Sequence, residues 1–280
     1  MERDASLKQL YFLHIPKTAG RYISENIKES LDKHNISHHI TNHFPNNNNF
    51  VNKSYISMHA GTYPIEKISD LDVATIVRNP IDARVSYFNF IYNKALYSRE
   101  DYMSISSPLE KLRYYLFEDS NFKSHNNYQS RFICNPADER SFKPLEFHRD
   151  HYEEMMYPFL RKGEGFTWFV NNDNTTLENT ISKINSFKIV STLDNIDLFK
   201  DNVSLWFKEN YDAEIKFSNN KINNSVTNFG DGRYLGSQDL IDMLSDQDKE
   251  DIINNNSIDY AVYKYINERT ILDNTLNGNV

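Results

Sequence analysis

The sequence predicts an α/β fold in which a central, mainly parallel sheet is flanked by helices, with helical elaborations in the second half of the chain. Short apolar runs at 10–15, 73–77 and 187–191 are typical of buried strands. Segments with apolar residues at helical spacing follow each of these runs. Parallel strands need such helical crossovers, so the alternation predicts a parallel sheet.

The chain is expected to form one domain over its 280 residues, because it contains neither an internal repeat nor a linker. Aromatic residues, among them 18 Tyr and 18 Phe, make up 14% of the chain and supply side chains for a substantial core. Residues 273–280 are predicted to be a disordered tail.

Composition narrows the class of ligand and the compartment. A net charge of -8 argues against a general nucleic-acid binder, so an anionic ligand needs a local cluster of cations. The single cysteine, Cys134, excludes an intrachain disulfide, and no Cys/His array has zinc spacing, which favours a reducing compartment. The sequence has neither a membrane-span-length apolar stretch nor a signal-peptide pattern at its N-terminus, so a cytoplasmic location is expected.

The first strand, 10–15, is followed by the loop Pro16-Lys17-Thr18-Ala19-Gly20 and by a helix that is predicted to end near His34. Such a junction directs backbone N–H groups and the positive end of a helix dipole at one point, where Lys17 adds a charge, so it suits a phosphate or sulfate. The loop is not a Walker A loop, because no glycine precedes Lys17 at the required spacing. Alternatively, Lys17 and Thr18 only begin the helix, with Thr18 as its cap.

A polar surface loop is predicted at 38–53, and a short strand at 54–58 brings His59 to its carboxyl end. If both strands are parallel, His59 lies at the same sheet edge as Lys17. The alternative is a loop histidine whose ring nitrogens are satisfied locally. His14 is interpreted as a core histidine.

The most apolar strand, 73–77, is predicted to be a central one and is followed by Arg78-Asn79-Pro80. Pro80 suits the first turn of a helix, which is predicted to reach about Tyr97. Arg78 and the Ser86 hydroxyl form a fitting clamp for one phosphate. Arg84 is expected to face that phosphate or solvent.

The remaining chain is predicted to be mainly helical, with one further strand. The expected helices are 108–118, 126–133, 150–159, 176–184, 193–207 and two or three within 237–269. The expected strand is 187–191, and a turn is predicted at 163–165.

Two of these motifs resemble those of a known family in order and spacing. His14-Ile15-Pro16-Lys17-Thr18-Ala19-Gly20 is similar to the 5'-phosphosulfate loop of the PAPS-dependent sulfotransferases, in the carbohydrate branch that includes the heparan sulfate 2-O- and 6-O-sulfotransferases. Arg78-Asn79-Pro80 with Arg84, Ser86 and Tyr87 resembles the 3'-phosphate motif of that family. Between them, 56–60 is similar to the segment that carries the catalytic histidine.

Weaker similarities extend along the chain. Residues 127–131 resemble a substrate-side helix of the family, and residues 189–198 resemble a strand-helix unit. Asn223-Asn224-Ser225 resembles an element that closes over the nucleotide, and residues 259–263 resemble the C-terminal helix. The chain departs from the family at Arg21 and Tyr22, where two small hydroxyl residues are usual. The resemblance implies a three-layer P-loop-like fold.

The resemblance also implies a function: in-line transfer of a sulfuryl group from 3'-phosphoadenosine-5'-phosphosulfate (PAPS) to an acceptor hydroxyl, with a saccharide favoured as acceptor, PAP as product and no metal required. His59 would be the general base, and Lys17 would stabilise the leaving group. The implied donor-binding residues are Pro16, Lys17, Thr18, Ala19, Gly20, Arg21, Tyr22, Arg78, Ser86 and Ser225. The suggested acceptor-binding residues are Tyr63, Tyr128, Gln129 and Arg131.

Two alternative functions remain. One is a non-catalytic protein that binds a nucleotide or a sulfated glycan on the same fold. The other, which is less favoured, is a kinase-like phosphotransferase that uses ATP. A kinase would need a Walker A loop and an acidic partner for Mg²⁺, and neither is evident in the sequence.

Overall fold

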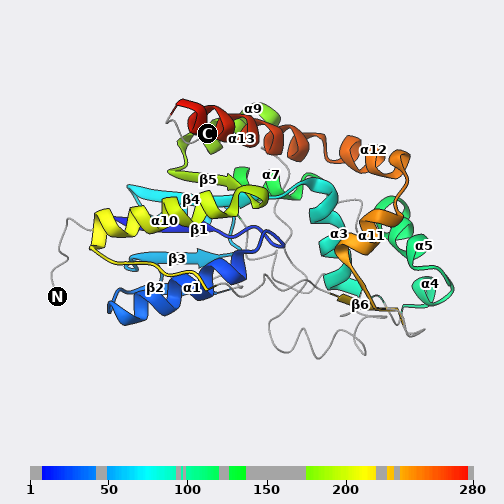
Figure 1. Cartoon of the computed structure of the whole chain (residues 1–280), viewed down its shortest axis with the longest axis horizontal. Helices are drawn as coiled ribbons and strands as arrows, with labels where there is room; N and C mark the ends of the chain where they lie inside the picture. Colours follow the sequence, from blue (N-terminus) through cyan, green and yellow to red (C-terminus); the bar gives the residue numbers. More distant parts are fainter. Residues whose placement is uncertain are drawn as a thin grey trace.

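A computed structural model describes residues 8–41, 49–92, 96, 99–119, 126–136, 175–218, 226–229 and 234–276. Its main sheet has five strands in the order β2-β3-β1-β4-β5, and every neighbouring pair is parallel (Figure 1). The strands are β1 (Gln9–Leu13), β2 (His38–Ile40), β3 (Tyr55–Met58), β4 (Leu71–Val77) and β5 (Ile189–Thr192). The predicted α/β fold with a parallel sheet is therefore confirmed.

Helices cover both faces of this sheet. Successive side chains of a strand point to opposite faces, so Leu10 and Phe12 contact one helical layer, while Tyr11 and Leu13 contact the other. The first layer consists of α1 (Gly20–Lys33) and α10 (Ile196–Tyr211). The second consists of α2 (Tyr63–Lys67), α7 (Tyr128–Cys134), α9 (Leu177–Ser186) and α13 (Ser257–Leu276). Burial on both faces explains why the central strands β1 and β4 are rich in apolar residues.

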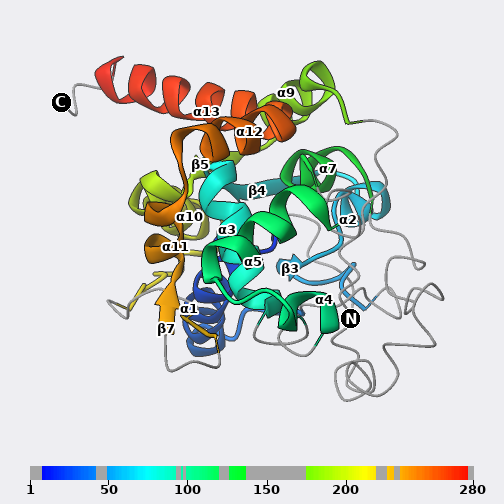
Figure 2. The ribbon, with the colours of Figure 1, turned by 90° about the vertical axis from the view of Figure 1, so that its right-hand side faces the viewer.

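A second apolar core, here called the helical core, is built around α3 (Pro80–Ile91). Figure 2 shows α3 between α11 and α5. Its other elements are α4 (Glu100–Met103), α5 (Pro108–Arg113), the π-helix η2 (Tyr114–Glu118), β6 (Val226–Asn228), β7 (Tyr234–Gly236), α11 (Ser237–Met243) and α12 (Asp246–Asn255). The strands β6 and β7 pair antiparallel as a separate two-stranded sheet. Helical elaborations were expected in the second half of the chain, but α3, α4, α5 and η2 of the helical core lie in the first half.

The start of α3 agrees with the sequence. The Asn79 side chain accepts a hydrogen bond from the backbone N–H of Ile81, 2.9 Å away, and Pro80 occupies the first helical position. The α-helical part ends at Ile91, and the next described residues, Tyr92 and Leu96, are π-helical. The described residues therefore agree with a helix that reaches about Tyr97, with a change from α to π geometry near its end.

Three boundaries differ from prediction. Within the expected surface loop 38–53, residues His38–Ile40 form the edge strand β2, because backbone pairing with β3 does not require apolar side chains. The helix predicted at 193–207 begins with a 3₁₀ turn, Leu193–Asn195, before α10. Helix α13 continues to Leu276, beyond the start of the predicted tail, since each added residue gains a backbone hydrogen bond.

Two predictions cannot be compared with the structure. The helix at 150–159 and the turn at 163–165 lie outside the described residues. Among the helices of the described part, none is both long enough and apolar enough to span a membrane.

Candidate functional site

The candidate site lies at the carboxyl edge of the sheet, between β1 and β4. These two strands are neighbours, but the chain leaves β1 through α1 toward β2 and leaves β4 toward β5 on the other side. Such a reversal of direction is where open α/β sheets bind ligands. Figure 1 shows the loop after β1, in dark blue, at the end of the sheet that faces α3.

The loop after β1 has an unusual backbone. Lys17 and Ala19 adopt left-handed conformations, with φ of 69° and 62°, which are uncommon for residues other than glycine. Left-handed residues in a short loop turn successive N–H groups toward one point and form anion-binding concavities, and such strain concentrates at functional sites. Two left-handed residues in this short loop therefore match the backbone pattern from which such concavities are built.

The alternative role of Thr18 as a helix cap is wrong. Ala19 occupies the cap position of α1 and provides no side-chain hydrogen bond. The Thr18 hydroxyl instead donates to the Ile15 carbonyl at 2.8 Å and is fully buried. The first backbone N–H groups of α1 thus have no side-chain cap, and the positive end of the helix dipole faces the loop.

The segment after β4 is in direct contact with the loop after β1. Arg78 follows β4, and its Nη1 donates to the Lys17 carbonyl at 3.3 Å. Its Nη2 lies 3.9 Å from the carboxylate of Asp82, one turn into α3. Burial raises the pKa of Asp82, and the Arg78 charge opposes this rise. The Lys17 ammonium lies 4.7 Å from the ring centre of Phe90.

His59 lies at the end of β3 and contacts the loop after β1. Its Nδ1 is 2.6 Å from the His14 carbonyl oxygen. A carbonyl only accepts hydrogen bonds, so Nδ1 carries the hydrogen, and Nε2 of the neutral ring holds the basic lone pair. The Tyr11 hydroxyl donates to the Gly61 carbonyl at 2.7 Å and fixes the turn behind His59.

His14 fills the space between His59 and the start of α1. Its ring centre lies 4.0 Å from that of His59, and the side chain is buried. Burial, followed by the charges of His59 and Lys17, lowers the pKa of His14 well below 6.5, so the ring is neutral near pH 7. A Cβ on Gly20 would lie 1.9 Å from the His14 Cδ2 atom, so residue 20 must be glycine for this packing.

Helix α7 contacts both the loop after β1 and the segment after β4. The Tyr128 hydroxyl donates to the Pro16 carbonyl at 3.2 Å. The Gln129 amide bonds the backbone of Arg78 twice: its Oε1 accepts from the N–H and its Nε2 donates to the carbonyl, both at 2.8 Å. Tyr128 and Gln129, which the sequence suggested for the acceptor side, therefore bond the loop after β1 and the segment after β4.

The remaining predicted donor residues are distributed around this centre. Arg21 is largely exposed and pairs with Glu25 at 2.8 Å, and the Tyr22 hydroxyl donates to the Ser218 carbonyl at 2.6 Å. Ser86 is buried on α3. Ser225 lies outside the described residues.

Two arginines and one tyrosine take positions that the sequence left open. Arg84 is 1% exposed, with its guanidinium carbon 5.2 Å from the ring centre of Tyr115, so it does not face solvent. Arg131 is half-buried, and burial lowers its pKa. Tyr63 is half-buried at the start of α2, with its ring centre 6.0 Å from that of Phe50.

The structure thus brings together four segments that are far apart in the sequence: the loop 14–20, the turn at His59, the segment 78–86 and the start of α7. Sequence reasoning did not assign roles to the side chains that hold α7 in place, Asn127 and Asp259. Their only signal is a polar residue at the start of each helix, and that pattern does not identify a partner about 130 positions away.

An open pocket of about 470 Å³ lies elsewhere, at α4 and α5. Its lining includes Asp101, Glu110 and Glu118, a charge opposite to the one an anionic donor needs. Among the described residues, no three potential metal-ligating side chains lie together.

No protein-family model and no curated protein matches this chain. The structure itself defines the class, an α/β protein with a parallel five-stranded sheet covered by helices on both faces.

Proposed function

We propose that this protein is a sulfotransferase on a P-loop-like fold, which moves the sulfuryl group of PAPS to a hydroxyl of a saccharide. The observation that carries the proposal is the convergence of four motifs at the switch point between β1 and β4. Within these motifs His59 can act as a base, and Lys17 and Arg78 carry positive charges. The loop after β1 adds left-handed residues, which suit a backbone that binds anions.

The donor would be held at both of its anionic ends. Backbone N–H groups of 17–20 and the dipole of α1 suit the 5'-phosphosulfate, and Lys17 adds a charge. Arg78 and Ser86 suit the 3'-phosphate, since a planar guanidinium matches a phosphate. Arg21 and Tyr22, which replace the usual small hydroxyl residues, would contribute their backbone N–H groups, because their side chains bond Glu25 and Ser218.

His59 is suited to remove the acceptor proton. Its Nδ1 hydrogen is held by the His14 carbonyl, so the ring is oriented and Nε2 is the atom that receives the proton. When bound, PAPS supplies an activated sulfuryl group, and the oxygen–sulfur bond to the acceptor forms as the bond to PAP breaks. Lys17 would stabilise the negative charge that develops on the leaving oxygen.

Ligand binding separates this function from the kinase-like alternative. We expect PAP to raise the unfolding temperature without Mg²⁺. At a PAP concentration one hundred times the dissociation constant, the unfolding free energy should rise by about 3 kcal/mol. Stabilisation by ATP with Mg²⁺, but not by PAP, would contradict the proposal. Transfer of label from PAPS to members of a saccharide panel separates catalysis from binding alone.

Substitution of His59 tests the assigned base. In His59→Asn, the side-chain amide nitrogen takes the place of Nδ1 and can still donate to the His14 carbonyl, but no basic nitrogen remains. We expect sulfate transfer to fall by roughly 10²–10⁴-fold while PAP binding is retained. The matched control is His34→Ala, at an exposed histidine. Unchanged transfer by a folded His59→Asn protein would rule out this base.

A further inference from the structure

Helices α7 and α13 cap each other. The first residues of a helix have N–H groups that need an acceptor, which is usually a side chain just before the helix. Asn127 precedes α7 but provides no cap to it; its Oδ1 accepts from the N–H groups of Ile258 and Asp259, at 3.0 and 3.1 Å, in the first turn of α13. Each helix therefore depends on a residue of the other.

Asp259 provides the missing cap of α7. Its carboxylate accepts from the N–H of Gln129 at 3.2 Å and from the N–H and hydroxyl of Ser130 at 2.8 and 2.5 Å. Asp259 is 2% exposed. Its charge also lies at the positive end of the α7 dipole, where an anion is stabilising.

The two residues next to this cap are those that contact the donor loops. Tyr128 bonds Pro16 in the loop after β1, and Gln129 bonds both backbone groups of Arg78 after β4. The Gln129 backbone is held by Asp259 while its side chain holds Arg78. A continuous chain of hydrogen bonds thus runs from α13 to the second phosphate motif.

We propose that Asp259 is a positioning residue of the donor site, which sets the places of Pro16 and Arg78 through the first turn of α7. The inference rests on the proposed function, since the donor is the ligand whose affinity it concerns. Helix α13 would then contribute to donor binding indirectly. It packs on one face of the sheet, and its Asp259 bonds α7 rather than the loop after β1 or the segment after β4.

The test compares three variants with the wild-type chain. Asp259→Asn keeps one acceptor oxygen but presents an amide donor to the remaining N–H group. Gln129→Met leaves the cap in place and removes only the bonds to Arg78. Ser130→Ala removes the hydroxyl bond and keeps both backbone bonds to Asp259. Glu268→Gln, at an exposed position of α13, is the matched control.

We expect Asp259→Asn and Gln129→Met each to raise the PAP dissociation constant and the KM for PAPS by about tenfold or more. The KM for the acceptor is expected to change less than the KM for PAPS, because the hydrogen bonds from Asp259 lead to the backbone of Arg78. Ser130→Ala is expected to change the donor KM by less than about threefold, and Glu268→Gln not at all. A general loss of stability would change both KM values or neither.

Hydrogen exchange of the ligand-free protein separates this inference from the proposed function. We expect the Arg78 amide, which donates to Gln129, to exchange faster in Asp259→Asn than in Glu268→Gln. Unchanged Arg78 exchange and unchanged PAP affinity in Asp259→Asn would overturn the inference. If wild-type protein fails to bind PAP but Arg78 exchange still accelerates, the coupling holds and the donor assignment fails. If Asp259→Asn does not fold, Gln129→Met decides the coupling.

Discussion

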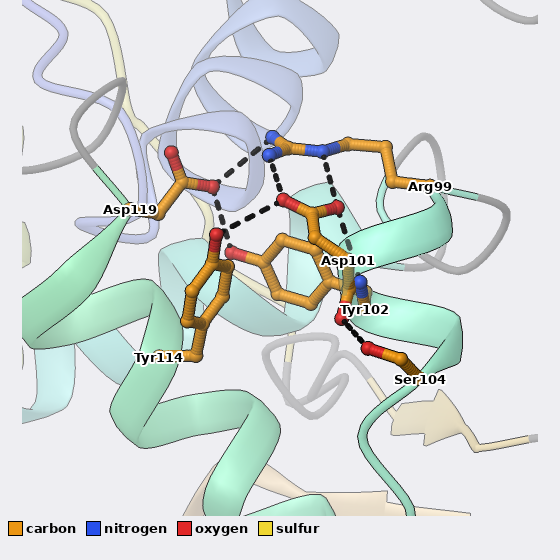
Figure 3. A network of polar contacts seen from close by, with 6 residues as sticks. All are labelled: Arg99, Asp101, Tyr102, Ser104, Tyr114 and Asp119. Atoms are coloured by element: carbon orange, nitrogen blue, oxygen red, sulfur yellow. Dashed lines mark hydrogen bonds and ion pairs between the residues drawn. The ribbon is translucent and has the colours of Figure 1, made fainter.

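Two arginines of similar burial, Arg78 at the sheet edge and Arg99 in the helical core, have very different partners. Their side chains are 20% and 15% exposed. Figure 3 shows Arg99 between two carboxylates: its Nε bonds Asp101 at 3.0 Å and its Nη1 bonds Asp119 at 3.0 Å. Among the residues that the structure describes, the Arg78 guanidinium bonds the Lys17 carbonyl and lies 3.9 Å from the carboxylate of Asp82, at the outer limit of an ion pair.

Tyrosines complete the surroundings of Arg99 in Figure 3. The Tyr102 hydroxyl donates to Asp119 at 3.0 Å, and that of Tyr114 donates to Asp101 at 3.2 Å. Burial and the neighbouring carboxylates raise the pKa of both hydroxyls, so they remain donors at neutral pH. The guanidinium of Arg99 is thus matched to acidic groups within the fold, which suits a structural role.

The difference shows that the partners of a buried cation, rather than its burial, indicate its role. A guanidinium that bonds two carboxylates directly has little capacity for an added anion. A guanidinium with one carbonyl and one distant carboxylate keeps donors for a bidentate ligand. This contrast is the reason for assigning the donor to the sheet edge and not to the acidic pocket at α4 and α5.

Replacement of each arginine by alanine is expected to give the largest effects on stability and on donor affinity. Arg99→Ala leaves the carboxylate of Asp119, which is 3% exposed, without its cation, so we expect a loss of about 3–5 kcal/mol in unfolding free energy. Arg78→Ala is expected to lose about 1 kcal/mol or less, because its ion pair is long. Denaturant unfolding measures both values.

Donor affinity should change in the opposite order. Arg78→Ala removes charge-assisted hydrogen bonds to a phosphate, so we expect PAP to bind roughly tenfold to a hundredfold more weakly. For folded Arg99→Ala protein, we expect a PAP dissociation constant within about twofold of the wild-type value, because Arg99 bonds groups of the helical core and not of the sheet edge. Equal losses of PAP affinity in the two variants would remove the distinction.

An added methyl group at the sheet edge should have the next largest effect. Gly20→Ala places a Cβ 1.9 Å from the His14 ring, so the ring or the start of α1 must move, and we expect a loss of about 1–3 kcal/mol in stability. In Gly236→Ala, at the start of α11, the nearest atom is a flexible carboxylate oxygen at 3.4 Å, so little change is expected. Thermal unfolding compares the two, and an equal effect would contradict the tight packing of His14.

The smallest expected effect is a pH dependence. The pKa of His14 lies well below 6.5 in the folded protein, so the unfolded chain binds more protons as the pH falls through about 6.5. His14 should therefore contribute a loss of about 1 kcal/mol of stability between pH 7 and pH 5.5.

The variant His14→Asn isolates this contribution, because the other titrating groups are common to both proteins. We expect its unfolding free energy to fall less steeply than that of the wild type over the same pH range. Parallel pH profiles of the two proteins would show that the buried ring does not govern this part of the dependence.

Much of the sheet could be predicted because its signals are local. The segments that became β1, β3, β4 and β5 are largely buried and rich in apolar residues, so their sequences carry a strand pattern. Strand β2 was missed because its residues, His38–Ile40, carry no strand pattern and pair only along one edge. The change from α to π geometry after Ile91 was not predicted, because no residue type in this segment marks it.

The sequence by itself determined the parallel α/β architecture, the loop after β1 and the positions of Lys17, His59 and Arg78 at strand ends. Those features follow from residue type and spacing within about twenty positions, where propensity and periodicity act. Only the tertiary structure decided which groups meet. The packing of His14 on Gly20, the bonds of Gln129 to Arg78 and the cap of Asp259 on α7 join residues that chain folding brings together, and no local pattern encodes such pairs.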